Sequence, residues 1–143
     1  MREQYLSKLF NPESIAVIGA SKKPEKVGYA IVKNLLECGY PGKIYPINPR
    51  EEQILGLRCY KTVSELLSSK EKGDPVGIDL AVIAIPASRV LEAVKECAGN
   101  NINLVIVITA GFKETGPEGL ELEKKLTAFC HEHKIRLLGP NCV

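Results

Sequence analysis

The stretch SIAVIGAS, residues 14–21, decides the fold of this chain of 143 residues. Its apolar, β-branched part predicts a buried strand over residues 15–18, and the small residues Gly19, Ala20 and Ser21 predict a tight turn into a helix. In α/β folds such a unit binds phosphate groups, because the backbone can approach the anion and the helix directs unpaired N–H groups at it. We therefore expect a nucleotide-like ligand at this turn.

The turn departs from the G-x-G-x-x-G fingerprint of dinucleotide-binding folds. The next glycine after Gly19 is Gly28, and Lys22, Lys23 and Lys26 stand between them. These lysines would add positive charge beside a phosphate bound at the start of the following helix. The alternative is an ordinary strand-to-helix turn flanked by solvated lysines. The residues that follow the other strands are therefore needed to decide which ligand binds.

Apolar, β-branched runs alternate along the chain with segments of helical periodicity. This alternation predicts an α/β fold, a Rossmann-like, doubly wound sheet of about five parallel strands with helices on both faces. The strands are expected at residues 15–18, 44–47, 80–85, 104–108 and 135–138. The helices are expected to bury the apolar positions Val27, Ala30, Ile31, Leu35 and Cys38; Val90, Leu91, Val94 and Cys97; and Leu122, Leu126, Phe129 and Cys130.

Several boundary signals agree with this element order. Residues 62–65, Thr-Val-Ser-Glu, read as a capping box that begins a short helix. Gly39 is suited to a helix C-cap and Pro117 to a first helical turn. Residues 1–13 are expected to be a lead-in, either a short helix or an interface arm, and residues 68–77 a surface connection.

Composition indicates one globular domain with a full core, since 45% of the residues are hydrophobic and 25% are charged. The net charge of +2, from 19 basic and 17 acidic side chains, argues against a general nucleic-acid binder. The apolar runs are too short to cross a membrane, and the first residues lack the apolar core of a signal peptide. We therefore expect a cytoplasmic protein without a membrane or nucleic-acid partner.

Cysteine and histidine usage predicts neither a metal site nor a catalytic residue. The five cysteines are an odd number, without a C-x-x-C pair or a histidine at metal-ligand spacing. His131 and His133 stand among charged residues of the last expected helix, with no nucleophile or carboxylate partner nearby in sequence. We expect both histidines to lie at the surface.

The turn after the second strand, Asn48-Pro49-Arg50, carries an arginine where NAD enzymes usually place a carboxylate for the ribose hydroxyl. A guanidinium there suits a phosphate attached to the ribose, which it can bind bidentately. Both NADP and coenzyme A carry such a phosphate. A surface arginine in an Asn-Pro turn is the alternative interpretation.

Small-residue turns also follow the remaining strands. Ile85, Pro86 and Ala87 predict a stiff, apolar rim that could lie against an adenine ring or a pantetheine arm, although a simple helix-entry turn is the alternative. Residues 109–112, Thr-Ala-Gly-Phe, and residues 139–142, Gly-Pro-Asn-Cys, are expected at the same edge. In a doubly wound sheet this carboxyl edge is where ligands bind.

Taken in order, several motifs resemble the N-terminal CoA-binding domain of NDP-forming acyl-CoA synthetases. They are SIAVIGAS, VGYAIVKNLLECGYPGKIYPINPRE with ILGL soon after, DLAVIAIPA, ITAGF with EGLELE, and RLLGPNC. The resemblance covers nearly the whole chain. It points to the ADP-forming acetyl-CoA synthetases, which are related to the α subunit of succinyl-CoA synthetase.

The resemblance implies that coenzyme A is the cofactor. It implies that the first turn and the helix start hold its phosphates, that the second turn lies against its 3′-phosphorylated end, and that the third turn guides its thiol. The predicted cofactor-binding residues are Gly19, Ala20, Ser21, Lys26, Val27 and Gly28; Asn48, Pro49 and Arg50; and Ile85, Pro86 and Ala87.

The family's reaction also requires a phosphohistidine domain and an ATP-grasp module, and neither fits into 143 residues. The resemblance therefore implies other domains or subunits as partners, leaves room for a homo-oligomer, and predicts that the chain alone lacks catalysis. Two alternatives stay open. The chain could be an NADP-binding module of an oxidoreductase, or a regulatory protein that senses coenzyme A or another nucleotide through the same pocket.

Overall fold

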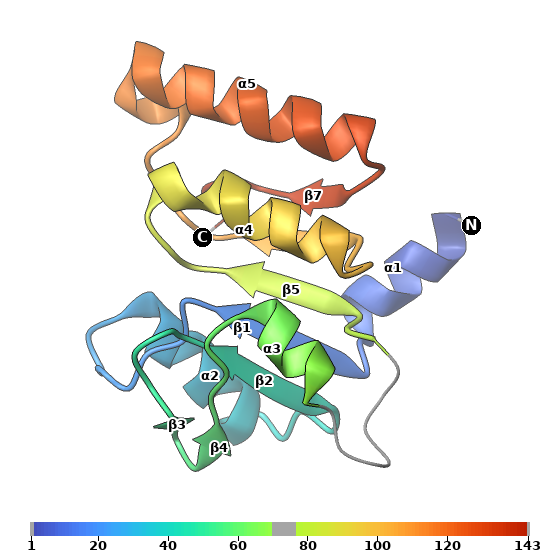
Figure 1. The fold of residues 1–143 in the computed structure, drawn as a ribbon, viewed down its shortest axis with the longest axis vertical. Helices are drawn as coiled ribbons and strands as arrows, with labels where there is room; N and C mark the ends of the chain where they lie inside the picture. The colour runs from blue at the N-terminus through green and yellow to red at the C-terminus, as the bar shows by residue number, and fades with distance from the viewer. Residues whose placement is uncertain (1, 70–76, 143) are drawn as a thin grey trace.

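The computed structural model describes residues 2–69 and 77–142, so most of the predicted surface connection at residues 68–77 lies outside the described residues. The ribbon in Figure 1 shows a central sheet with helices packed against it. The elements are α1 (Arg2–Phe10), β1 (Ser14–Ile18), α2 (Val27–Glu37), β2 (Lys43–Ile47), β3 (Gln53–Ile54), β4 (Leu57–Arg58), α3 (Val63–Ser68), β5 (Leu80–Ile83), α4 (Ala87–Gly99), β6 (Leu104–Val107), a single 3-10 turn (Lys113–Thr115), α5 (Pro117–Glu132) and β7 (Arg136–Leu138).

The main sheet has five strands in the order β2-β1-β5-β6-β7, and every pairing is parallel. This confirms the predicted α/β, doubly wound sheet. From β1 the chain moves to β2 on one side and then crosses to β5 on the other, so the direction of winding switches between β1 and β5. Strands β5 and β6 end before the predicted residues 85 and 108, because the chain turns there at the carboxyl edge.

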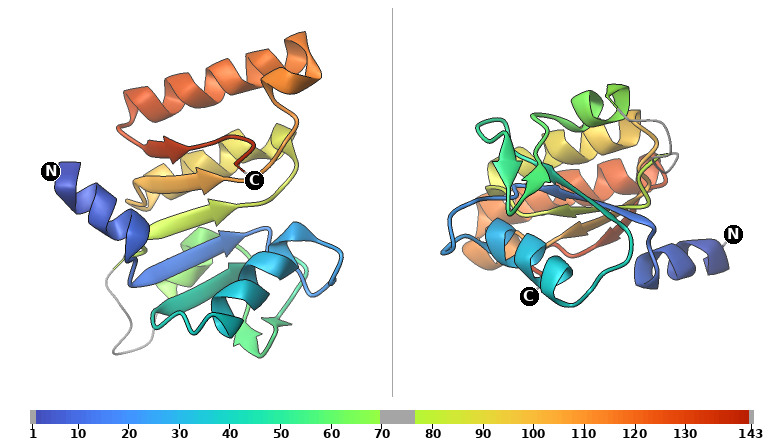
Figure 2. Two further views of the ribbon diagram at one scale, coloured as in Figure 1. Left: turned by 180° about the vertical axis from the view of Figure 1, so that it is seen from behind. Right: turned by 90° about the horizontal axis from the view of Figure 1, so that it is seen from below.

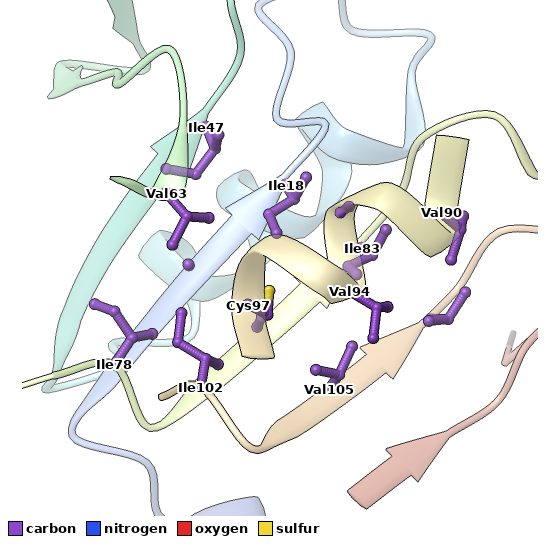
Figure 3. Packing of buried hydrophobic residues seen from close by; sticks show 14 of the residues in the cluster. Ile18, Ile47, Val63, Ile78, Ile83, Val90, Val94, Cys97, Ile102 and Val105 are labelled. Atoms are coloured by element: carbon purple, nitrogen blue, oxygen red, sulfur yellow. The ribbon is translucent and has the colours of Figure 1, made fainter. Parts of the chain in front are cut away.

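Helices lie on both faces of the sheet, as predicted, with α2 on one face and α3 and α4 on the other (Figure 2). The larger core lies on the α4 face, where apolar side chains of the sheet meet those of α3, α4 and α5. Figure 3 shows the part of this core between the sheet, Val63 of α3 and α4. Val90, Val94 and Cys97 of α4 are fully buried there, which confirms the predicted face of this helix. Leu126 and Cys130 of α5 are buried as predicted too.

The predicted buried face of α2 is right only in part. Ile31 and Leu35 pack against the core as predicted, whereas Val27, which is 55% exposed, Ala30 and Cys38 lie at the surface. The buried residues of the helix are Gly28 and Val32. The physical reason is the position of Gly28, because a Cβ on this residue would overlap the carbonyl oxygen of Gly19. The Gly28 side of the helix therefore packs against the sheet, and Val27 lies at the surface.

Burial makes two of the cysteines unreactive. It raises the pKa of the Cys97 thiol to about 12 and that of Cys130 to about 11. Both side chains are therefore neutral at physiological pH and pack as small apolar residues.

The predicted helix caps are confirmed. Thr62 precedes α3, and its hydroxyl accepts a hydrogen bond from the backbone N–H of Glu65 at 3.0 Å. The carboxylate of Glu65 accepts from the N–H of Lys61 at 2.9 Å, which completes a variant of the capping box. Pro117 is the first residue of α5, and Gly39 follows α2 with a φ of 71°.

Two features near the ends of the sheet were not defined by the sequence patterns. A hairpin of β3 and β4 follows β2, with Leu55 and Gly56 at its turn in left-handed conformations. The lead-in is a helix, α1, joined to the domain by a Lys8–Asp79 ion pair of 3.1 Å. Within the described part of the chain, no helix combines the length and the apolar character that crossing a membrane requires.

The cap of α3 can be tested by Thr62→Ala. The substitution removes the acceptor for the Glu65 N–H, so we expect the free energy of unfolding to fall by about 1 kcal/mol. Urea denaturation measures this loss. Thr127→Ala, at an exposed position inside α5, is the matched control, and equal stability of the two variants would contradict the capping role.

Candidate functional site

The carboxyl ends of β1, β2 and β5 meet at the switch point, where an open cavity of about 940 Å³ lies. Sites for small ligands usually measure about 300 to 1,000 Å³. Smaller or more apolar cavities lie beside α1 at the amino ends of the strands, away from the predicted site. The cavity wall includes five of the twelve predicted residues: Gly19, Asn48, Pro49, Arg50 and Ile85.

The other predicted residues lie around this cavity in the turns and helix starts. Ala20 is fully buried beneath the first turn, and Gly28 is buried against Gly19. Ser21, Lys26 and Val27 follow the first turn up to the start of α2, with Lys26 and Val27 exposed. Pro86 and Ala87 form the β5–α4 turn.

The first turn requires glycine at position 19. Its φ is 92°, a conformation that other residues rarely adopt. A Cβ there would also overlap the carbonyl oxygen of Ala84 and lie 2.8 Å from a methyl group of Ile85. The Gly19 N–H donates to the carbonyl of Ile47 at 3.0 Å. The turn is therefore in direct contact with the neighbouring turns on both sides.

Two of the helices that begin at this edge, α2 and α4, have starts without a side-chain cap. The N-cap residue of α2 is Lys26 and that of α4 is Pro86, and neither makes a side-chain capping hydrogen bond. The Ser21 hydroxyl accepts from the N–H of Lys23 instead, at 3.0 Å. The partial positive charge of a helix N-terminus therefore remains available to an anion at both starts.

Asn48 joins the first two turns. Its side-chain amide donates to the carbonyl of Ala20 at 2.8 Å, and its side-chain oxygen accepts from the N–H of Arg50 at 2.8 Å. Both ends of the side chain are therefore bound to the backbone. Asn48 therefore holds the first and second turns together.

The charges at the site differ from the simple cluster of lysines expected from the sequence. Lys22 forms an ion pair of 3.2 Å with Glu51, which follows the second turn, so its charge is already partly compensated. Arg50 is exposed, and its side chain makes no ion pair among the residues that the structure describes. Its guanidinium is free to bind an anion.

The turns after β5, β6 and β7 are also joined, which sequence spacing did not reveal. The Thr109 hydroxyl donates to the carbonyl of Ile85 at 2.6 Å, and the Thr109 carbonyl accepts from the N–H of Asn141 at 3.0 Å. Backbone N–H groups, chiefly that of Gly111, bind the Glu114 carboxylate and lower its pKa. Glu114 therefore holds the turn after β6 as an anion at neutral pH.

His131, His133 and Cys59 do not line the cavity. His131 and His133 are exposed on α5, as predicted, and the His133 ring stacks on Phe129 with 4.0 Å between centroids. Burial raises the pKa of the Cys59 thiol. Over residues 2–69 and 77–142, no three His, Cys, Asp or Glu side chains gather closely enough to hold a metal ion. The arrangement can bind an anionic ligand through backbone N–H groups and arginine.

Comparison with protein families gives a match over nearly the whole chain. A family model described as "CoA binding domain" matches residues 13–143. The chain is 45% identical over 138 residues to acetate–CoA ligase [ADP-forming] II subunit alpha of Pyrococcus furiosus, covering 96% of this chain and 28% of that protein. It is 42% identical over 142 residues to acetate–CoA ligase [ADP-forming] of Methanocaldococcus jannaschii, covering 99% of this chain and 18% of that protein.

Solved structures agree with these relatives. Dinucleotide forming acetyl-coenzyme A synthetase 1 of Ca. Korarchaeum cryptofilum, in complex with phosphate and ADP, superimposes with a TM-score of 0.83 at 44% identity, covering 95% of this chain and 27% of that one. A conserved hypothetical protein of Pyrococcus furiosus superimposes with a TM-score of 0.69 at 29% identity, covering 91% of this chain and 95% of that one. The chain thus spans less than a third of the length of each of the two acetate–CoA ligases.

The contact between the first turn and α2 can be tested by Gly28→Ala. The new methyl group would overlap the Gly19 carbonyl, so α2 must shift, and we expect a loss of about 1 to 3 kcal/mol in the free energy of unfolding. Gly99→Ala is the matched control, because a Cβ on Gly99 meets no atom within 4 Å. Chemical denaturation compares the two, and a Gly28→Ala variant as stable as Gly99→Ala would show that the contact is not tight.

Proposed function

The chain belongs to the family of CoA-binding domains, and on this premise we propose that it holds coenzyme A for an ADP-forming acyl-CoA synthetase of the acetate–CoA ligase type. The observation that carries the proposal is that the family match covers all three turns around the cavity. The first turn leads to the start of α2, which has no side-chain cap, and the second turn carries Arg50, which forms no ion pair among the described residues. Both features favour a ligand with more than one phosphate group.

The residues at the cavity fit the chemical groups of coenzyme A. The Gly19 turn and the start of α2 offer backbone N–H groups to its diphosphate, and they leave room because Gly19 carries no side chain. The Arg50 guanidinium suits its 3′-phosphate. Ile85, Pro86 and Ala87 offer an apolar rim to the pantetheine arm. When bound, coenzyme A supplies the thiol that accepts the acyl group.

We assign a binding and positioning role to this chain. Asn48 holds the first two turns at a fixed separation, and Thr109 does the same for the turns after β5 and β7. Because the turns are already ordered, the protein would lose little conformational entropy when a ligand binds across them. Neither His131 nor His133 lines the cavity, which supports a chain that does not itself carry the phosphoryl group.

The rest of the reaction is proposed to take place in other domains or subunits. The chain covers 28% of one acetate–CoA ligase α subunit that it resembles, which supports partners that supply the remaining functions. We propose that a phosphohistidine domain and an ATP-grasp module are those partners. Acyl transfer would then occur where the thiol, held at the carboxyl edge, meets the acyl phosphate.

The choice between coenzyme A and NADP is tested by thermal unfolding with each ligand, with ADP and dephospho-CoA as further arms. A ligand present at about a hundred times its dissociation constant stabilises the folded state by roughly 2.7 kcal/mol. We expect coenzyme A to raise the midpoint most. A midpoint that rises with NADP and not with coenzyme A would overturn the proposed function.

The role of Arg50 is tested by Arg50→Glu. The substitution places a negative charge beside the 3′-phosphate, so we expect the affinity for coenzyme A to fall by about tenfold or more and that for dephospho-CoA to fall far less. Isothermal titration calorimetry measures both affinities. Lys124→Glu, at an exposed position of α5, controls for the change in net charge. Equal losses for the two ligands would place Arg50 away from the 3′-phosphate.

A further inference from the structure

The wall of the cavity carries more positive charge than its acidic residues compensate. Four basic and two acidic side chains line it: Arg50, Lys61, Arg89, Lys95, Glu92 and Glu96. Both acidic side chains are already engaged. Glu92 pairs with Lys95, with 3.5 Å between Nζ and Oε1, and Glu96 accepts hydrogen bonds from the N–H and hydroxyl of Ser64 at 3.1 and 3.3 Å.

Three of the basic side chains are left without an acidic partner. Among the ion pairs of the described residues, none involves Arg50, Lys61 or Arg89. Lys22, which the sequence pattern suggested as a source of positive charge beside a phosphate, differs from these three residues because it forms an ion pair with Glu51. Three basic side chains without an ion pair among the described residues therefore line this one cavity, where together they attract a polyanion.

The three cations come from two opposite walls. Arg50 follows β2, and Lys61 follows Tyr60, whose carbonyl accepts from the N–H of Asn48 at 2.9 Å, so these two share one wall. Arg89 lies in the first turn of α4, after β5. Strand β1 separates β2 from β5, so two strand spacings, about 10 Å, lie between the walls. Arginine side chains from both walls can reach a phosphate placed between them.

On the basis of the proposed function, we propose that Arg89 and Lys61 are further ligands of the 3′-phosphate of coenzyme A and, with Arg50, set the preference for coenzyme A over dephospho-CoA. A phosphate monoester carries about −1.5 to −2 charges at pH 7, so one guanidinium compensates only part of it. Arg89 can bind two of its oxygens bidentately. The start of α4, which has no side-chain cap, adds to the positive potential beside Arg89.

The test compares Arg89→Gln and Lys61→Gln with the wild-type chain by calorimetric titration of coenzyme A and dephospho-CoA. We expect Arg89→Gln to weaken coenzyme A by about tenfold or more, because a hydrogen-bonded charge pair is lost, and to change dephospho-CoA by less than about twofold. Lys61→Gln should show the same selectivity with a smaller loss, since lysine binds as a point charge. Arg89→Lys should lose less than Arg89→Gln.

Lys95→Gln is the matched control, because Lys95 lines the same cavity but is paired with Glu92. If Lys95→Gln and Arg89→Gln lowered the affinity for coenzyme A equally, the loss would come from the general positive potential of the cavity. That result would overturn a direct contact between Arg89 and the 3′-phosphate. Arg89→Gln losses that are equal for the two ligands, or absent for both, would also overturn it. Unchanged thermal midpoints establish that the variants fold.

A double-mutant cycle of Arg50→Gln and Arg89→Gln tests whether the two residues share one phosphate. We expect losses that are clearly non-additive for coenzyme A, since residues bound to the same group couple. Additive losses would place the two arginines on different groups and overturn the assignment. A wild-type chain that binds no coenzyme A would overturn the proposed function itself, whereas binding that is insensitive to Arg89→Gln overturns this inference alone.

Discussion

Gly28, at the start of α2, lies so close to Gly19, at the end of β1, that a side chain on Gly28 would overlap the Gly19 carbonyl. This contact sets the rotation of α2, so that Val32 faces the sheet and is fully buried. It also brings the positive end of the helix against the first turn, where a phosphate can approach the backbone. The position of the site therefore depends on Gly19 and Gly28, because neither residue has a side chain that would push α2 away from the first turn.

The other turns are held relative to this contact by hydrogen bonds. Asn48 ties the turn after β2 to Ala20, and Thr109 ties the turn after β6 to those after β5 and β7. None of these links uses a charged side chain of the cavity wall. Polar uncharged residues thus order the edge, while Arg50 and Arg89 form no ion pair among the residues that the structure describes.

The five strands could be predicted because parallel strands buried on both faces read as continuous apolar runs. The packing of α2 could not, since a glycine that packs by having no side chain is invisible to a hydrophobic pattern. The β3–β4 hairpin was missed because each strand has two residues and its turn is Leu55-Gly56, a weak hairpin signal. Spacing likewise could not show that Lys22 is paired with Glu51 and Arg89 is not.

The central claim, that the carboxyl edge at the switch point binds coenzyme A, is tested most directly by mapping backbone amide chemical shifts in a ¹⁵N-labelled chain during titration with coenzyme A. We expect the perturbed amides to cluster at residues 19–28, 48–50 and 85–89. We expect little change at the cavity between α1 and β7. Perturbations centred on α1 and β7, with none at the Gly19 turn, would contradict it.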